Sequence, residues 1–249
     1  MDAIQDYLLG LADDELILGH RDSEWCGRAP ILEEDIAFAN IALDEIGHAD
    51  LWYGLLAELS GEDPDTYPDR LVYFREPMDY RNIQMVELPI GDWAFTILRQ
   101  YLFDACEQVR LEALAHSQYT PLANIASKIV KEEFYHYRHT SVWVQRLGLG
   151  SSESHLRMQN ALDDIWPYTA QMTQPMAGED SLVQAGIVPD SSQLQSIWQA
   201  KVIPFLQECS LALPDLPGMA LQREEHTPYL RVLIEEMQSV ARSEANAVW

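Results

Sequence analysis

Two short stretches of the sequence carry a glutamate followed three residues later by a histidine. LDEIGHAD, residues 43–50, contains Glu45 and His48, and KEEFYHYRH, residues 131–139, contains Glu133 and His136. On a helix, residues three apart project from the same face, so each pair could bind one metal ion. The alternative is a structural role, because a single buried acid or histidine more often has a polar protein partner than a metal.

A dinuclear carboxylate site needs one further acid from each of two other helices. Glu15 lies 30 residues before Glu45, and Asp104 lies 29 residues before Glu133. This near-equal spacing predicts that the four acids lie in one layer. Glu107 lies one turn from Asp104 on nearly the same helix face, so it remains an alternative to Asp104 as the fourth acid.

Charge explains why such a set of residues would bind metal. Four carboxylates in a low-dielectric core repel one another, and two divalent cations would offset their charge. Oxygen ligands with neutral imidazoles suit iron, with manganese as the alternative, and leave open positions for oxygen or water. The competing account is neutralisation of the acids by basic side chains, for which the candidates are Arg99, Lys128 and Arg138.

Apolar residues recurring at alternating steps of three and four predict four long helices, at residues 2–25, 31–60, 92–117 and 121–148. Short connections within the first two and the last two predict two antiparallel hairpins. The proline-rich stretch 61–91 is long enough to cross the whole bundle. We therefore predict one all-α, ferritin-like domain over residues 1–249, with further helices at 153–166, 193–211 and 227–244 and an irregular segment at 168–192.

Composition excludes several classes of function. The formal net charge is −24, from 40 acidic and 16 basic residues, which disfavours nucleic acid as a partner. No apolar run approaches the ~20 residues that span a membrane, and the N-terminus lacks the order of a signal peptide, so we expect a cytoplasmic protein. We expect the three cysteines to be reduced and buried. The remaining acids are interpreted as solvated or capping residues, among them Glu33, Glu34, Asp35 and Glu132.

Four stretches, at residues 23–49, 85–105, 131–169 and 224–238, resemble the C subunits of ring-1,2-phenylacetyl-CoA epoxidases, also called phenylacetate-CoA oxygenases. They include LEEDIAFANIALDEIGHA, MVELPIGDWAF and EEHTPYLRVLIEEMQ. The resemblance runs nearly end to end and is weakest over residues 170–220. It implies a ferritin-like component of a bacterial multicomponent monooxygenase in aerobic phenylacetate catabolism.

The resemblance also implies partners and a cofactor. It implies an A-type catalytic subunit that carries a di-iron centre, a reductase that delivers electrons, an acyl-CoA substrate of the complex, and both hetero- and homo-oligomers. The C subunits of this family are described as lacking metal ligands, whereas this chain retains six candidates. Three interpretations stay open: an oxygenase subunit with its own di-metal site, a non-catalytic structural subunit, and a stand-alone di-iron protein that handles oxygen or peroxide.

Overall fold

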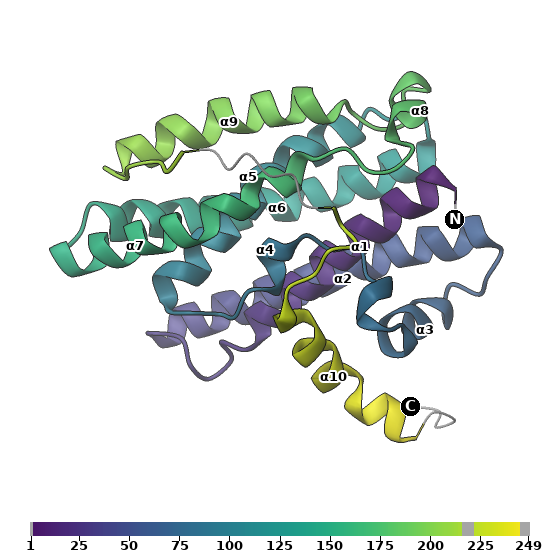
Figure 1. Cartoon of the computed structure of the whole chain (residues 1–249), viewed down its shortest axis with the longest axis horizontal. Coiled ribbons are helices and arrows are strands. Elements are labelled where there is room, and N and C mark those ends of the chain that lie inside the picture. The colour runs from purple at the N-terminus through teal and green to yellow at the C-terminus, as the bar shows by residue number, and fades with distance from the viewer. Residues whose placement is uncertain (1, 216–221, 245–249) are drawn as a thin grey trace.

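The computed structural model describes residues 2–215 and 222–244, and throughout these ranges the regular structure is helical, with no strand (Figure 1). This confirms the all-α expectation. None of the helices in the described part is both long enough and apolar enough to cross a membrane.

Four long helices form the bundle: α1 (Ala3–Ser23), α2 (Leu32–Ser60), α5 (Trp93–Leu114) and α6 (Thr120–Gly148). Helix α1 packs along α2, α5 packs along α6, and α2 contacts α6, so two helical hairpins lie against each other. The long connection between α2 and α5 runs along the bundle (Figure 1). The predicted ferritin-like arrangement of two hairpins and one crossover is therefore confirmed.

Local signals in the sequence fix where these helices begin and end. Asp2 accepts a hydrogen bond from the Gln5 amide, and Asp92 caps the first turn of α5 in the same way. Pro121 lies in the first turn of α6, where a missing amide hydrogen does no harm. Gly61 ends α2 with a φ of 69°, a left-handed conformation that favours glycine.

The crossover contains structure that the sequence analysis did not predict: α3 (Tyr67–Phe74), a 3₁₀ turn at Pro77–Asp79 and the short α4 (Gln84–Glu87). Two buried aspartates of α1 hold it in place. The Asp13 carboxylate accepts hydrogen bonds from the Arg75 guanidinium and, at 2.7 Å, from the Arg81 backbone amide. The Asp14 carboxylate accepts one from the Ile83 amide at 2.7 Å.

The C-terminal part covers both sides of the bundle with α7 (Ser152–Ile165), a 3₁₀ helix (Trp166–Thr173), α8 (Glu179–Gln184), α9 (Ser191–Glu208) and α10 (Pro228–Ser243). Helices α7 and α9 pack against α5, whereas α10 packs against α3 (Figure 1). The prediction that residues 168–192 are irregular was wrong where the 3₁₀ helix, α8 and the start of α9 lie, whereas residues 174–178 and 185–190 are irregular as expected. These turns are too short to show a helical period of apolar residues.

The expectation about the cysteines was only partly confirmed. Cys106 and Cys209 are buried free thiols, as expected, but Cys26 is exposed, because it lies in the turn between α1 and α2. Helix α1 is buried on nearly every side, including its run of acids Asp13, Asp14 and Glu15. It is covered by α2, by α4 of the crossover and by α8.

We expect Asp13→Ala to lower the free energy of unfolding by about 3 kcal/mol or more, because it leaves the largely buried Arg75 guanidinium without its acidic partner. Chemical denaturation followed by circular dichroism measures the change. Asp164→Ala is the matched control, since Asp164 is exposed on α7, and we expect a change within about 0.5 kcal/mol. Equal effects of the two substitutions would contradict the role given to Asp13.

Candidate metal centre

The six residues expected to form a site all lie in the interior of the bundle. Glu15 comes from α1, Glu45 and His48 from α2, Asp104 from α5, and Glu133 and His136 from α6. None has more than 4% of its surface exposed. The helical pattern that placed them on core-facing stripes therefore put them in the same region of the protein.

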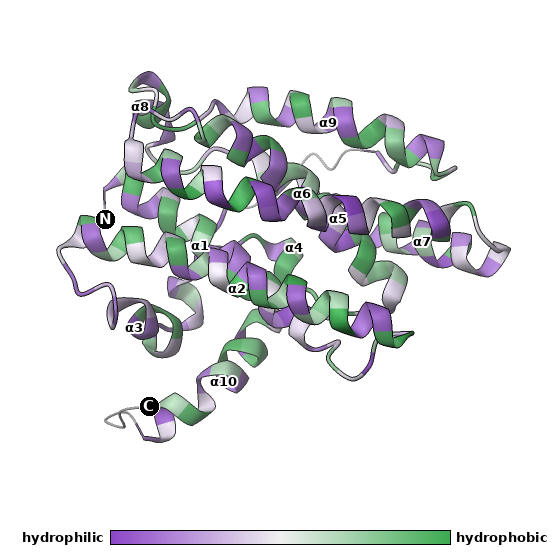
Figure 2. Cartoon of the chain, turned by 180° about the vertical axis from the view of Figure 1, so that it is seen from behind, coloured by the Kyte–Doolittle hydropathy of each residue, from purple (hydrophilic) through white to green (hydrophobic). Residues whose placement is uncertain are grey.

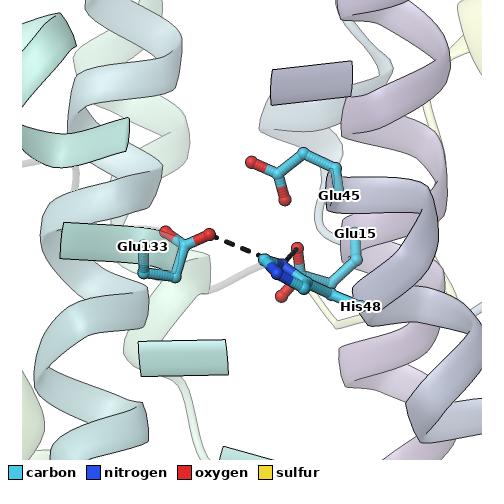
Figure 3. Close-up of side chains that lie close together, drawn as sticks. All are labelled: Glu15, Glu45, His48 and Glu133. Carbon is cyan, nitrogen blue, oxygen red and sulfur yellow. Dashed lines mark ion pairs between the residues drawn. The ribbon is translucent and has the colours of Figure 1, made fainter. Parts of the chain in front are cut away.

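Their ligand atoms form two overlapping groups. One group contains Glu15, Glu45, His48 and Glu133, and the other contains Glu45, Asp104 and His136. Within each group the oxygen and nitrogen atoms lie within 4.8 Å of one another. Figure 3 shows Glu133 facing the side chains of α1 and α2 across the middle of the bundle. Since Glu45 belongs to both groups, the arrangement matches two adjacent ion positions that share a carboxylate.

Both histidines direct Nδ1 toward the cluster. His48 Nδ1 lies 3.5 Å from Glu133 Oε1 and 3.8 Å from Glu15 Oε2. His136 Nδ1 lies 3.0 Å from Glu133 Oε1 and 3.5 Å from Glu45 Oε1. A neutral imidazole in either position could offer a lone pair to an ion.

The outer nitrogen of each histidine contacts a carboxylate that the sequence analysis missed. His48 Nε2 lies 2.9 Å from Glu132, and His136 Nε2 lies 3.2 Å from Asp44. Such an outer carboxylate fixes the tautomer and orientation of a ligating imidazole. Glu132 is still partly exposed, as expected, but its contact with His48 gives it a specific role that the sequence analysis did not predict. The signal was present in the sequence, because an acid directly precedes each glutamate of the two Glu and His pairs.

Two other acids interpreted as solvated or capping also have specific partners. Glu34 is buried, and its Oε2 lies 2.9 Å from His139 Nε2. Asp35 accepts a hydrogen bond from the Gly27 amide and so holds the turn before α2. Glu34 departs from the solvated interpretation, because α6 covers the side of α2 on which it lies.

The two candidates for the fourth acid have different surroundings. Asp104 lies in the cluster, where Gln100 Nε2 and the Thr140 hydroxyl donate to its two oxygens at 2.8 Å and 2.7 Å. The same Gln100 nitrogen donates to Glu45 at 2.7 Å. Glu107 instead forms an ion pair with Arg110, one turn further along α5. The charge of Glu107 is thus offset by the protein itself.

The basic residues proposed to neutralise the cluster lie elsewhere. Arg99 lies 3.6 Å from Asp22 and donates to the Leu88 carbonyl, while Lys128 and Arg138 are exposed on α6. Within residues 2–215 and 222–244, no lysine or arginine forms an ion pair with the four acids of the cluster. The account based on basic side chains therefore has no support in the geometry.

Unsatisfied polar atoms provide a test of whether an ion fits. Both carboxylate oxygens of Glu15, one oxygen each of Glu45 and Glu133, and Nδ1 of His48 are buried without a hydrogen-bond partner. Buried polar atoms in proteins are almost always satisfied, so such a concentration requires an explanation. Oxygen and imidazole donors that face a common point are the ligands that iron and manganese accept. The residues present therefore fit a metal.

The acid–base properties of the cluster show how crowded its charge is. Burial raises the pKa of Glu15 well above its usual range, and the nearby Glu45 carboxylate raises it further. Burial also raises the pKa of Asp104 well above its usual range, and the Glu133 carboxylate adds to this shift. Burial opposes ionisation of Glu45 too, but the neighbouring Glu15 and His136 groups lower its pKa to about 2. Burial disfavours the His136 cation, yet Glu133 raises its pKa well above the usual range. Without metal, protons provide the missing positive charge.

The helical bundle and its buried cluster define a ferritin-like protein with a carboxylate and imidazole centre that could hold metal. The chain belongs to the phenylacetic acid catabolic protein family, which matches over residues 1–249. It is 35% identical to the C subunit of the 1,2-phenylacetyl-CoA epoxidase of Escherichia coli (strain K12), over the full length of both chains. It is also 28% identical to the A subunit of the epoxidase from that organism over 155 residues, which make up 62% of this chain and 48% of its relative.

We expect the melting temperature of the metal-free protein to fall as pH rises from about 5 to about 8, by roughly 3 °C or more. The raised pKa values of Glu15, Asp104 and His136 mean that the folded state holds protons that the unfolded state has released. Stability is therefore lost as pH rises through the folded-state values. Calorimetry in a buffer that contains a chelator measures the melting temperature at each pH.

Glu15→Gln provides the comparison for this pH dependence, because glutamine cannot ionise. Burial raises the pKa of Asp22 to about 8 and that of Glu107 to about 7, and both act in the same direction, so the difference between the wild type and this variant isolates the contribution of Glu15. We expect the variant to show a shallower fall and a higher melting temperature without metal. A wild-type melting temperature that rises with pH would show that the cluster is not protonated.

Proposed function

We propose that this chain is a subunit of a multicomponent oxygenase that epoxidises the aromatic ring of phenylacetyl-CoA, and that it holds its own dinuclear metal centre. The full-length identity to the C subunit of such an enzyme supports the first part. The observation that carries the second is the set of buried, unpartnered ligand atoms on Glu15, Glu45, His48 and Glu133.

In this proposal, Glu15, Glu45, His48 and Glu133 would hold one ion, and Asp104 and His136, together with Glu45, would hold the other. Glu133 Oε1 approaches both imidazoles, so Glu133 could serve both positions. Iron is our choice of metal and manganese the alternative, because oxygen and imidazole ligands suit both. A bound di-iron centre supplies the reductive activation of oxygen that epoxidation requires.

Other residues of the chain maintain this arrangement. Glu132 and Asp44 orient the two imidazoles, and Gln100 holds Glu45 and Asp104 at a fixed separation. The Thr140 hydroxyl fixes the second oxygen of Asp104. Four of the six candidate ligands, Glu45, His48, Asp104 and His136, are thus held by contacts outside the cluster, which is how outer contacts tune a metal site.

The same proposal gives the chain its partners. We infer a reductase component and an A-type catalytic subunit, with the acyl-CoA substrate bound at the level of the complex. Phosphates of coenzyme A need cationic or helix-terminal donors, and most arginines of this chain already contact acids. We place the complex in the cytoplasm, where acyl-CoA thioesters are available.

A non-catalytic structural subunit is the second candidate function. The observation that favours it is Gln100, whose amide donates to Glu45 and Asp104 together and so offsets part of their repulsion without a metal. In this case the cluster would be a buried polar network that helps to join the two hairpins.

Metal analysis separates the two functions. We expect protein produced with iron to contain about two metal ions per chain, and the Glu45→Ala/Glu133→Ala variant to lose both, because it removes the shared carboxylates. Mass spectrometry of the metal content and thermal stability with and without chelator provide readouts that do not depend on activity. A wild-type protein without metal after such production would leave only the structural function.

Two substitutions test whether Asp104 or Glu107 is the fourth acid of the site. Asp104→Asn should lower the metal content, whereas Glu107→Gln should retain it, because Glu107 is paired with Arg110 outside the two groups of ligand atoms. The opposite result would assign the fourth ligand to Glu107.

Co-production with an A-type partner tests membership of the complex. We expect the two chains to co-purify through affinity capture of either one, with a stable complex in size-exclusion chromatography. A chain that binds metal but does not associate with an A-type partner would instead support a stand-alone metalloprotein.

A further inference from the structure

The outer sides of α2 and α6 form one continuous face that exposes large apolar side chains. Leu32, Ile36 and Leu43 of α2 have 70%, 56% and 67% of their surface exposed, and Tyr135 and Val142 of α6 have 66% and 46%. Figure 2 shows hydrophobic and hydrophilic stretches alternating along α2. We call this surface the α2–α6 face. Apolar patches of this kind on soluble proteins mark interaction sites.

The two edges of the α2–α6 face carry opposite charge. Helix α6 exposes four basic residues, and in the part of the chain that the structure describes none of them forms an ion pair: Lys128, Lys131, Arg138 and Arg146. The arginines of other elements mostly contact acids, as Arg70 contacts Glu62. Helix α2 exposes acids on its outer side, namely Glu33, Asp50 and Glu58. A chain with a net charge of −24 therefore concentrates its unpaired cations beside a row of acids.

Contacts between α2 and α6 fix the register of the two edges. Asp44 contacts His136, and His48 contacts Glu132, so the helices run antiparallel. Continuing this register, Asp50 lies level with the turn that contains Lys131. Glu33 at the start of α2 lies toward the end of α6 that carries Arg146, and its neighbour Glu34 lines a groove with Arg146. Acids and bases thus occupy matching heights along the face.

We propose that the α2–α6 face is an interface between two copies of this chain, related by a two-fold axis parallel to the helices. Such an axis keeps every residue at its own height and exchanges the two helices, so α2 of one copy lies over α6 of the other. Asp50 would then face Lys131 of the second copy, and Glu33 would approach its Arg146. A two-fold axis across the helices would place like charges together, which is unfavourable.

The size of the face suits a stable dimer. Helices α2 and α6 each have 29 residues. At ~1.5 Å per residue and ~10 Å per helix width, the face measures roughly 40 Å by 20 Å, or about 800 Å² per copy. This is the area that a typical specific interface buries on each partner, about 800 Å². The apolar middle and charged edges also match the usual composition of such interfaces.

Dimerisation would cover structural features that connect to the cluster. The groove between α2 and α6, of about 510 Å³, is lined by Asp44, His136 and Arg138 among others. The side chains of Asp44 and Glu132 are each 44% exposed in one copy. A second copy over this face would shield both of these outer carboxylates from solvent. The interface itself does not depend on whether the cluster binds metal.

Sedimentation velocity of the purified full-length chain tests the proposal directly. We expect a dimer at micromolar concentration, and an increase of at least about tenfold in the dimer dissociation constant for Lys131→Glu/Arg146→Glu and for Glu33→Lys/Asp50→Lys. Ile36→Glu, on the apolar middle of the face, should have a comparable effect. Circular dichroism checks that each variant is folded, which we expect because all these side chains are exposed.

Mixing the two charge-reversed variants tests the proposed symmetry. Each variant alone places like charges opposite each other, but a mixed pair places reversed α6 over reversed α2 and native α2 over native α6. We therefore expect the mixture to recover a dimer dissociation constant within about threefold of the wild type. Native mass spectrometry distinguishes mixed pairs from pairs of identical chains. Failure of the mixture to associate would exclude this two-fold arrangement.

Matched controls come from α10, which lies away from the face. Arg231→Glu and Val232→Glu change an exposed base and an exposed apolar residue, and we expect neither to alter dimerisation. A chain that is monomeric at all concentrations would overturn the proposal. So would a dimer that is unaffected by the variants of the face. Loss of an A-type partner by these variants, with a monomeric wild type, would assign the face to that partner instead.

Discussion

The crowding of four carboxylates in the buried interior of the bundle is the constraint on which the rest of this structure depends. Glu15, Glu45, Asp104 and Glu133 come from four different helices and are almost completely buried. Like charges at such short range cannot all ionise in a low-dielectric medium unless positive charge faces them. The amide of Gln100 and the imidazoles of the cluster relieve only part of this repulsion. Protons or multivalent cations must provide the rest, which is why the cluster is both an acid–base centre and a candidate metal site.

The two hairpins contribute equivalent sets of groups to this centre. The first hairpin provides Glu15 from α1 and Asp44, Glu45 and His48 from α2. The second provides Asp104 from α5 and Glu132, Glu133 and His136 from α6. The outer contacts cross between the hairpins, since His48 of α2 meets Glu132 of α6 and His136 of α6 meets Asp44 of α2. The cluster therefore joins the two halves of the bundle as well as assembling ligands. A substitution of Asp44 or Glu132 would therefore affect both the joining of the two hairpins and the orientation of a histidine of the cluster.

The acids of α1 illustrate how burial from several sides separates similar residues into different roles. Asp13 pairs with Arg75 of the crossover, and Asp14 pairs with Arg223 near the C-terminal helix. Glu15, the next residue, faces the cluster, and within residues 2–215 and 222–244 no lysine or arginine forms an ion pair with it; His48 Nδ1 lies 3.8 Å away. Because successive helical residues point about 100° apart, three adjacent acids reach three different environments. Only the third is left for a metal to satisfy.

The sequence by itself determined the four long helices, the hairpins with their crossover and five residues of the cluster, and it left Asp104 and Glu107 as alternatives for the sixth. These features follow from the helical period of apolar residues and from short-range spacing, which are local properties of the chain. Tertiary structure alone decided that Glu107 is neutralised by Arg110 while Asp104 faces the cluster, because two acids one turn apart look equivalent until their surroundings are known. It also decided the contacts of Asp44 and Glu132, whose histidine partners lie 92 and 84 residues away along the chain. Periodicity specifies which face of a helix is buried, but only the packing of distant segments specifies what that face meets.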